Sequence, residues 1–185
     1  MFYTNQAYQL ETKFSKFEGA AALRNGCEIS GYASVFGQAD QTGDVVQAGA
    51  YKVSLQRLVA EGRSIKMLWQ HDPSKPIGVW DEVYEDSNGL FVKGRLLLEI
   101  QGGSDALMLI KAGAIDGLSI GYRTLRAEKK ENNKRLLHEL ELWEVSLVTF
   151  PMLPQARVTT DGKADDELAN ELAAALNAAR LEMLT

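Results

Sequence analysis

The chain has 185 residues, of which 45% are hydrophobic, and a formal net charge of −5. This length can bury one sizeable core, so we expect a single domain with tails, and the acidic balance argues against general nucleic-acid binding, which needs a basic face. Cys27 is the only cysteine, no run of about 18 apolar residues is present, and the first residues lack a basic start followed by an apolar stretch. We therefore expect no disulfide framework, no membrane span, no signal peptide and a reducing, cytoplasmic compartment.

The first third of the chain reads as two strands, a loop and a helix. Residues 7–17 alternate in polarity, and residues 27–36 are rich in β-branched and aromatic side chains, which predicts a strand in each. Residues 37–49 are polar and punctuated by glycine, so we expect a long loop there. Residues 50–60 place apolar side chains at helical spacing, and Gly62 can end that helix.

The middle of the chain is mostly strand. Residues 64–70 are a short apolar strand, after which residues 71–76 should leave regular structure, because their two prolines block helix and central-strand pairing. Residues 77–85 and 90–98 read as strands that flank a strong hairpin turn at residues 86–89.

A helix and a hairpin follow in the sequence. Residues 104–112 predict a short helix with Ser104 as its cap, and residues 118–127 and 135–150 predict strands around a charged, solvated turn. About seven strands with a few helices indicate an α+β fold, most naturally a closed or nearly closed, mostly antiparallel β-barrel surrounded by helices.

The C-terminal part has its own composition. It is rich in alanine, leucine and glutamate after Gly162, and residues 164–184 predict an amphipathic helix. We therefore expect one domain over residues 1–162, and over residues 163–185 a helix that packs on the domain or a partner, or a processed tail.

Three residues, each in an apolar and strand-like setting, could form a nucleophile with its base and acid. His71 ends a buried strand, Ser119 lies between glycines, and Glu144 shares a strand face with mostly apolar residues. A buried carboxylate needs a partner, and a histidine whose tautomer it holds is such a partner. Together they predict a hydroxyl-nucleophile hydrolase.

Other interpretations of the same residues stay open. His71 could be a structural histidine, and Glu144 could be partly exposed or paired with Arg123 or Arg157. The sequence around Ser119 also fits the G-x-S-x-G nucleophile elbow, but the following residues look extended and the order of histidine and serine disagrees with that fold. His138, beside the charged turn, is a weaker candidate base. The histidines and the cysteine lack ligand spacing and no phosphate-binding or dinucleotide motif is present, so no metal or cofactor is expected.

Eight short motifs follow one another along the chain. They are GYASVFG at 31–37, GDVV at 43–46, GAY at 49–51, LWQHD at 68–72, PIG at 76–78, DSNGL at 86–90, GLSIGY at 117–122 and WEVSLV at 143–148. In this order and spacing they resemble the prohead protease family of tailed bacteriophages, and the resemblance runs from about residue 29 to residue 158.

This resemblance implies a capsid maturation protease, similar in fold to herpesvirus assemblin, with a β-barrel ringed by helices. Carried over to this chain, it implies Ser119 as nucleophile, His71 as base, Glu144 where assemblin has a second histidine, and Arg157 as a donor to the oxyanion.

The implied partners are the major capsid protein and the scaffold as substrates, the chain itself through autocleavage, and by analogy a second copy in a homodimer. No membrane or direct nucleic-acid partner is expected, and the place of action would be the host cytoplasm inside the assembling prohead. The alternatives are a non-enzymatic capsid-assembly scaffold factor with the same fold and an esterase of small substrates.

Overall fold

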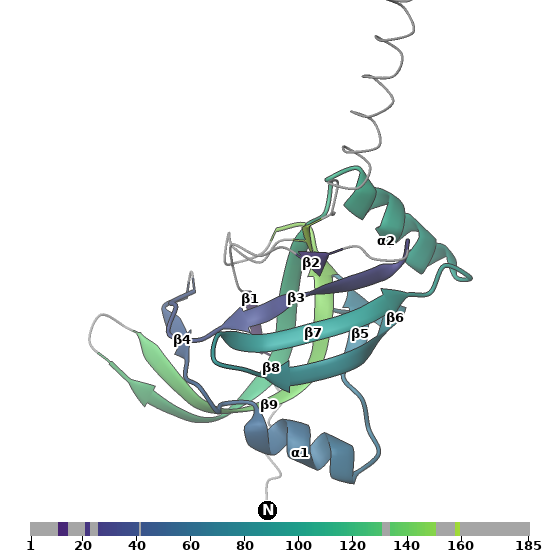
Figure 1. Cartoon of the computed structure of the whole chain (residues 1–185). Helices are drawn as coiled ribbons and strands as arrows, with labels where there is room; N and C mark the ends of the chain where they lie inside the picture. Colours follow the sequence, from purple (N-terminus) through teal and green to yellow (C-terminus); the bar gives the residue numbers. More distant parts are fainter. Residues whose placement is uncertain are drawn as a thin grey trace, which may run out of the picture.

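A curled sheet with a helix at each end forms most of the described part of the chain (Figure 1), and two short strands form a separate parallel pair. The structure is a computed structural model that describes residues 11–14, 21–22, 26–40, 42–130, 134–150 and 158–159. Its elements are β1 (Glu11–Phe14), β2 (Ala21–Ala22), β3 (Glu28–Val35), β4 (Asp44–Val46), α1 (Lys52–Ala60), β5 (Lys66–Trp69), β6 (Asp72–Glu85), β7 (Gly89–Leu96), α2 (Gln101–Lys111), β8 (Gly117–Lys129), β9 (Arg135–Val148) and β10 (Val158–Thr159).

The sheet is mixed, which corrects the expected mostly antiparallel barrel. Its strands follow the order β1-β8-β9-β5-β6-β7-β3. Neighbours are antiparallel except β5 and β9, and β4 also pairs in parallel with β9. The hydrogen-bonded path thus ends at β1 and β3 and curls into a half-barrel. Alternation in a sequence has the same period in parallel and antiparallel strands, so it predicts where strands lie but not how they run.

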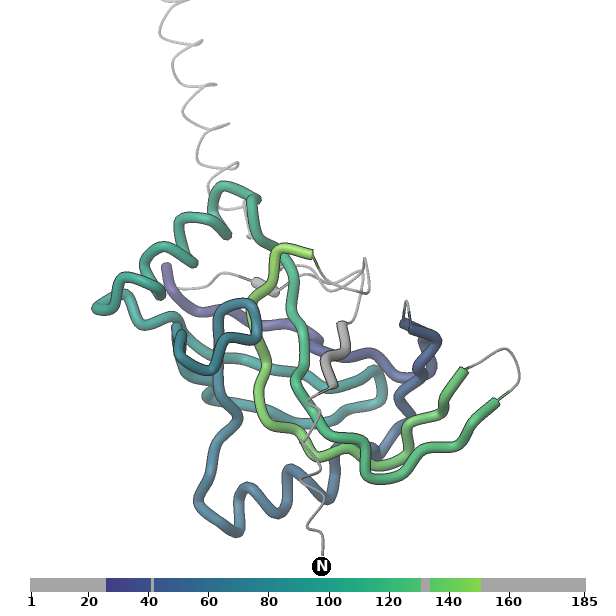
Figure 2. Tube along the Cα trace, turned by 180° about the vertical axis from the view of Figure 1, so that it is seen from behind, coloured from purple at the N-terminus to yellow at the C-terminus, as the bar shows by residue number. Residues whose placement is uncertain are grey.

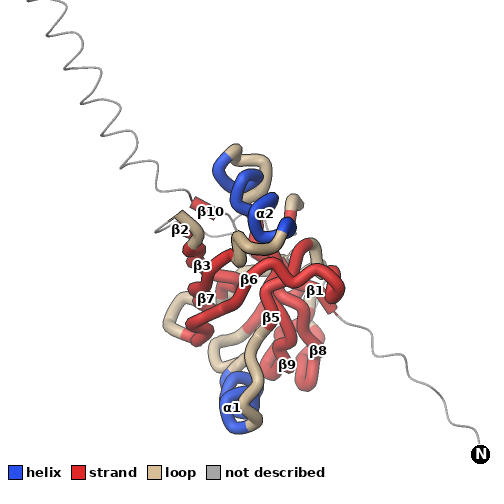
Figure 3. The backbone as a smooth tube through the Cα atoms, turned by 90° about the vertical axis from the view of Figure 1, so that its right-hand side faces the viewer, coloured by secondary structure: helices blue, strands red, loops and turns tan. Residues whose placement is uncertain are grey.

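Strand β9 is the centre of this arrangement. One of its edges carries β8, and the other is shared by β4 near its start and β5 near its end. The two helices lie at opposite ends of the sheet (Figure 3), and α1 contacts β9. The Ser54 hydroxyl of α1 accepts a hydrogen bond from the Leu142 amide at 2.9 Å, and the Trp80 indole donates to the Val145 carbonyl at 3.1 Å. These contacts hold β9 on either side of Glu144.

Three local predictions were wrong. The expected loop at 37–49 contains the short strand β4. Helix α2 begins at Gln101 and its N-cap is Ile100, which has no side-chain cap, so Ser104 lies inside the helix rather than capping it. Strand β6 begins at Asp72 and includes both prolines, which the ladder accommodates because the register between β5 and β6 shifts there.

The last residues of β8 and the first residues of β9 extend away from the rest of the sheet as a hairpin, seen from behind in Figure 2, and β4 pairs with the beginning of β9 there. At the first residue of β9, the Arg135 guanidinium donates to both carboxylate oxygens of the buried Asp44, at 2.8 and 2.5 Å. The predicted helix over residues 164–184, and with it the expected boundary after residue 162, lies outside the described residues. None of the described helices is long and apolar enough to cross a membrane.

Candidate active site

A continuous hydrogen-bonded chain joins the three residues singled out from the sequence. The Ser119 Oγ lies 2.7 Å from His71 Nε2, and His71 Nδ1 lies 2.6 Å from Glu144 Oε1. An ionised carboxylate only accepts hydrogen bonds, so Nδ1 carries the proton in the neutral ring. Nε2 is then the acceptor, and the Ser119 hydroxyl donates to it. This is the arrangement that a serine nucleophile and its base require.

His71 is placed by an unusual turn. Gln70 and His71 are the two residues between β5 and β6, and both have positive φ, 53° and 61°. Trp69 and Asp72 pair across them. Positive φ at both central positions is the type I′ turn, which matches the twist of the strands that it joins. For residues other than glycine this conformation costs on the order of 1–3 kcal/mol each, and it persists only where the surroundings hold it.

Strand β9 supplies the contacts that hold the turn. The Gln70 amide donates to the Leu147 carbonyl at 2.9 Å, and the Gln70 side chain donates to the Thr149 hydroxyl at 2.6 Å. The His71 amide donates to the Ser146 hydroxyl at 3.1 Å. The backbone of the base is therefore tied to the strand that carries the carboxylate, so the imidazole and Glu144 keep their relative position.

Ser119 and the acid come together through the register of β8 and β9. Ser119 lies opposite Ser146, and Gly121 lies opposite Glu144. A Cβ on Gly121 would stand 2.2 Å from Glu144 Oε1, the same oxygen that contacts His71. Only a glycine at this position leaves room for the carboxylate to lie across β8 and reach the histidine.

The Glu144 carboxylate is buried, and each of its two oxygens has a hydrogen-bond partner. The Glu144 side chain is 5% exposed and that of His71 is 17% exposed. The second oxygen of Glu144 accepts a hydrogen bond from the Ser146 hydroxyl at 2.5 Å. A buried charge requires such partners, so Ser146 supports the acid and, through its other contact, the turn that bears the base.

The nucleophile is closed off in this conformation. Ser119 is fully buried. On the side of β8 away from β9, strand β1 pairs antiparallel with it, and Phe14 lies opposite Ser119. The Ser119 hydroxyl is therefore not in contact with solvent in this conformation.

The other sequence candidates fall elsewhere. His138 lies 3.5 Å from Glu128 on the extended hairpin, and Arg123 pairs with Glu141 at 2.6 Å. Ser119 sits within β8 rather than on a strand-to-helix turn, which removes the nucleophile-elbow interpretation. Arg157 lies outside the described residues. Within the described part of the chain, no three histidine, cysteine or acidic side chains gather to hold a metal ion.

Two contributors to the site were missed by the sequence analysis. Ser146 shares the strand parity of Glu144, so its presence on the same face was visible, but a serine on an apolar face has no distinctive pattern. Gly121 was recognised only as a small neighbour of Ser119. Its close approach to Glu144 depends on the register of β8 against β9, which no local pattern specifies.

Several known proteins are similar to this chain in sequence or in structure. A sequence profile described as caudovirus prohead serine protease matches residues 15–171. The prohead protease of Enterobacteria phage HK97 is 31% identical over 140 residues, which cover 74% of this chain and 61% of that protein. The prohead protease of Escherichia phage T5 is 35% identical over 127 residues, covering 67% and 58%. The chain thus spans about three fifths of the length of these relatives.

Two further matches are more distant. The capsid polyprotein of Pseudomonas phage PAJU2 is 31% identical over 110 residues, which cover 56% of this chain and 16% of that protein. The structure of the bacteriophage T4 capsid assembly protease gp21 superposes with a TM-score of 0.59 at 15% identity, and covers 77% of this chain and 98% of that one. At this identity the superposition shows a shared fold.

Proposed function

Because the chain belongs to the caudovirus prohead serine protease family, we propose that it is a serine endopeptidase of phage head maturation. Its substrate is the capsid scaffold or the scaffolding segment of the major capsid protein, and the chain itself is a second substrate. The observation that carries the proposal is the hydrogen-bonded chain from Ser119 through His71 to Glu144. The names of the relatives, prohead protease and capsid polyprotein, support capsid protein as the substrate class.

The first half of the reaction uses all three side chains. Ser119 Oγ attacks the carbonyl carbon of the scissile bond while its proton passes to His71 Nε2. Glu144, 2.6 Å from Nδ1, stabilises the imidazolium that forms and keeps the ring in the tautomer that can accept the proton. A positioned base of this kind contributes about 10²–10⁴-fold to the rate.

The second half returns the site to its starting state. The tetrahedral intermediate collapses, and His71 gives its proton to the leaving amine, so the peptide bond breaks and an ester remains on Ser119. Water then attacks the ester while His71 takes its proton, and the bond between the acyl carbon and Ser119 Oγ breaks as His71 returns that proton to the serine, which releases the carboxylic acid product. Arg157 is our proposed donor to the oxyanion, and losing one such donor costs about 2.7–4 kcal/mol of transition-state stabilisation.

Intact mass spectrometry of a co-expressed capsid precursor tests the proposal. With the wild-type chain we expect defined fragments, and with Ser119→Ala or His71→Ala we expect the precursor uncut. Ser87→Ala, at an exposed serine in the turn between β6 and β7, is the matched control and should cut as wild type does. Identical fragments from Ser119→Ala would remove the proposed nucleophile. If the precursor stays uncut with the wild-type chain and nevertheless assembles, the result would favour a non-enzymatic scaffold factor.

A further inference from the structure

A four-residue strand from the beginning of the chain lies along the strand that bears the nucleophile. This strand, β1, is the last one on its side of the hydrogen-bonded path. It runs antiparallel to β8, with Thr12 opposite Gly121 and Phe14 opposite Ser119. The pairing therefore covers two positions on which the site depends, the nucleophile and the glycine that makes room for the Glu144 carboxylate.

Strand β8 is held in the sheet by β9, so β1 is an addition to its outer edge. The pairing of β8 with β9 extends from Gly117 to Lys129, whereas β1 pairs only with Ser119 to Tyr122. The first six residues of β8 are buried, and its last five are exposed. Without β1, the backbone groups of β8 beside the nucleophile would form an open sheet edge, which is a template for pairing with another extended chain.

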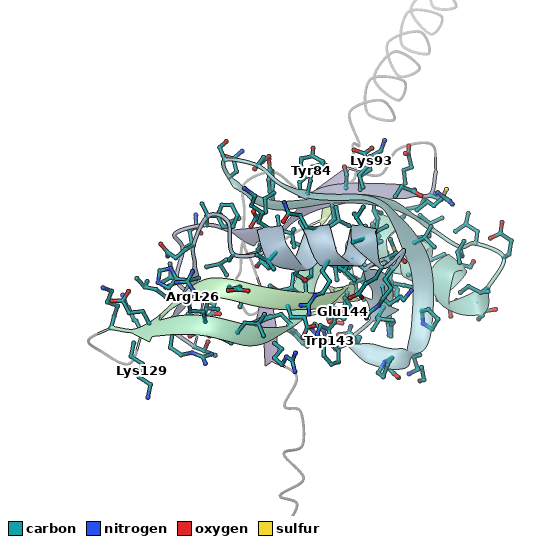
Figure 4. The ribbon with its side chains drawn as sticks, turned by 90° about the horizontal axis from the view of Figure 1, so that it is seen from below. Tyr84, Lys93, Arg126, Lys129, Trp143 and Glu144 are labelled. Atoms are coloured by element: carbon teal, nitrogen blue, oxygen red, sulfur yellow. The ribbon has the colours of Figure 1, made fainter. Side chains whose placement is uncertain are left out.

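An extended substrate chain fits the same edge. A serine nucleophile needs the scissile carbonyl held about 3–3.5 Å from its oxygen, and main-chain hydrogen bonds to a sheet edge hold a chain in place largely without regard to its side chains. The stretch that β1 covers contains Ser119 itself. The other end of β8 carries Lys129 on the extended hairpin, which Figure 4 shows away from Glu144, so a chain paired there would not meet the reacting groups.

We propose that β1 occupies the place of the substrate chain on the edge of β8, so that the protein is latent until β1 leaves. This inference rests on the proposed function and adds to it a binding mode for the substrate and a means of regulation. A substrate in this place runs in the direction of β1, from Tyr122 toward Ser119. β8 begins at Gly117, just before Ser119, but continues to Lys129 after it. The substrate residues that precede the cleaved bond therefore carry most of the pairing.

The length of β1 suits a contact that has to open. It pairs with four residues of β8, and short strands at the edge of a sheet are among the parts of a fold that open most readily. A substrate chain that pairs with more of β8 can take its place. Weakening β1 should consequently make Ser119 more reactive, whereas weakening a strand that only supports the fold would leave the reactivity unchanged or lower it.

The rate at which a fluorophosphonate labels Ser119 in the full-length chain tests this sign. Successive amides of a strand point to opposite sides, so only one of the neighbouring residues Thr12 and Lys13 donates to β8. Proline removes that donor but is tolerated on an edge strand where the amide points away. Of Thr12→Pro and Lys13→Pro, we expect one to be labelled about two- to tenfold faster than wild type, as for the loss of one hydrogen bond, and the other at the wild-type rate.

A matched variant and a second assay accompany the labelling. Lys129→Pro places a proline at the far end of the same strand and should leave the labelling rate of Ser119 as in wild type. The proline variant that is labelled faster should also cut the capsid precursor faster than wild type does.

A synthetic peptide with the sequence of residues 8–17 tests the same edge without any substitution. Added to the wild-type chain, it should slow the labelling of Ser119, and it should do so at a lower concentration in the faster proline variant, where β1 competes less. Methylating the peptide nitrogen at the position whose proline opened the site should abolish this effect, whereas methylation at the neighbouring position should not.

The failure of this inference can be told apart from failure of the proposed function. Labelling that is equal or slower in both Thr12→Pro and Lys13→Pro, or a peptide without effect, would overturn the latency, while precursor cleavage that Ser119→Ala abolishes still supported the protease. An absence of labelling at Ser119 in every variant, or equal cleavage of the precursor by Ser119→Ala, would overturn both.

Discussion

Adding one methyl group at Gly121 is expected to disable the site although His71, Ser119 and Glu144 are all kept. A Cβ there would stand 2.2 Å from Glu144 Oε1 and 2.9 Å from its Cγ and Cδ. Ordinary van der Waals contact begins at 3.4 Å, so the carboxylate must shift by about 1.2 Å (3.4 − 2.2) to make room. The displaced oxygen is the one that lies 2.6 Å from His71 Nδ1, so the methyl group and that hydrogen bond cannot coexist.

The size of the effect follows from this displacement. Misplacing a catalytic group by about 1 Å can cost about 10²-fold in rate, and losing the acid's correct contact with the histidine about 10⁴-fold. We therefore expect Gly121→Ala to lower kcat/KM by about 10²–10⁴-fold, equivalent to about 3–5 kcal/mol. The free energy of unfolding should fall by only about 1–3 kcal/mol, as for other overpacked sites, so the variant stays folded.

Cleavage of the capsid precursor measures the rate, and thermal unfolding measures the stability. Gly102→Ala adds the same methyl group where the nearest atom is 3.3 Å away, on Ile77, and serves as the control. Combining Gly121→Ala with Glu144→Gln should add little to either single effect, because both act through one carboxylate. A wild-type rate in Gly121→Ala, or fully additive losses in the double variant, would refute the reasoning.

Four further predictions concern Ser146, Tyr51 and strand β1. Ser146→Ala removes the donor to Glu144 Oε2 and should slow cleavage about tenfold or more, as expected for a hydrogen bond to a charged group; an unchanged rate would contradict this role. The fully buried Tyr51 hydroxyl makes no hydrogen bond within the described residues, so Tyr51→Phe should gain about 1 kcal/mol in denaturant unfolding. Burial also raises the pKa of the Tyr51 phenol well above its ordinary value, so the unfolded chain releases this proton first, and wild type should lose stability above about pH 10 more steeply than the variant. Because β1 pairs with β8 opposite the buried Ser119, deleting residues 1–14 should speed covalent labelling of Ser119 by a fluorophosphonate, and slower labelling of the folded variant would count against this.

The placement of strands and helices was largely predictable, whereas strand direction was not. Residue composition and turn signals located β3, β7 and β9 to within two residues at each end. The parallel pairing of β5 with β9 joins segments far apart in the chain, and neither sequence carries a mark of it. The short β4 was also unpredictable, since its three residues pair with the beginning of β9 inside a polar, glycine-rich stretch.

The site was predictable as a set of residue types but not as a geometry. His71, Ser119 and Glu144 each occupy an apolar setting in the sequence, and a buried carboxylate needs a partner, for which His71, Arg123 and Arg157 were all open. The left-handed backbone at Gln70 and His71 could not be foreseen, because type I′ turns favour asparagine and glycine. It is held instead by contacts to β9, which only the assembled sheet supplies.

The most direct test of the proposed mechanism is to identify the residue that reacts with a fluorophosphonate. The wild-type chain and Ser119→Ala, His71→Ala and Glu144→Gln would be labelled, digested and mapped by peptide mass spectrometry. We predict one adduct, on Ser119, absent in Ser119→Ala and formed more slowly when either His71 or Glu144 is replaced. An adduct on another residue, or labelling of Ser119 at the same rate without His71, would contradict the assignment of these three side chains as nucleophile, base and acid.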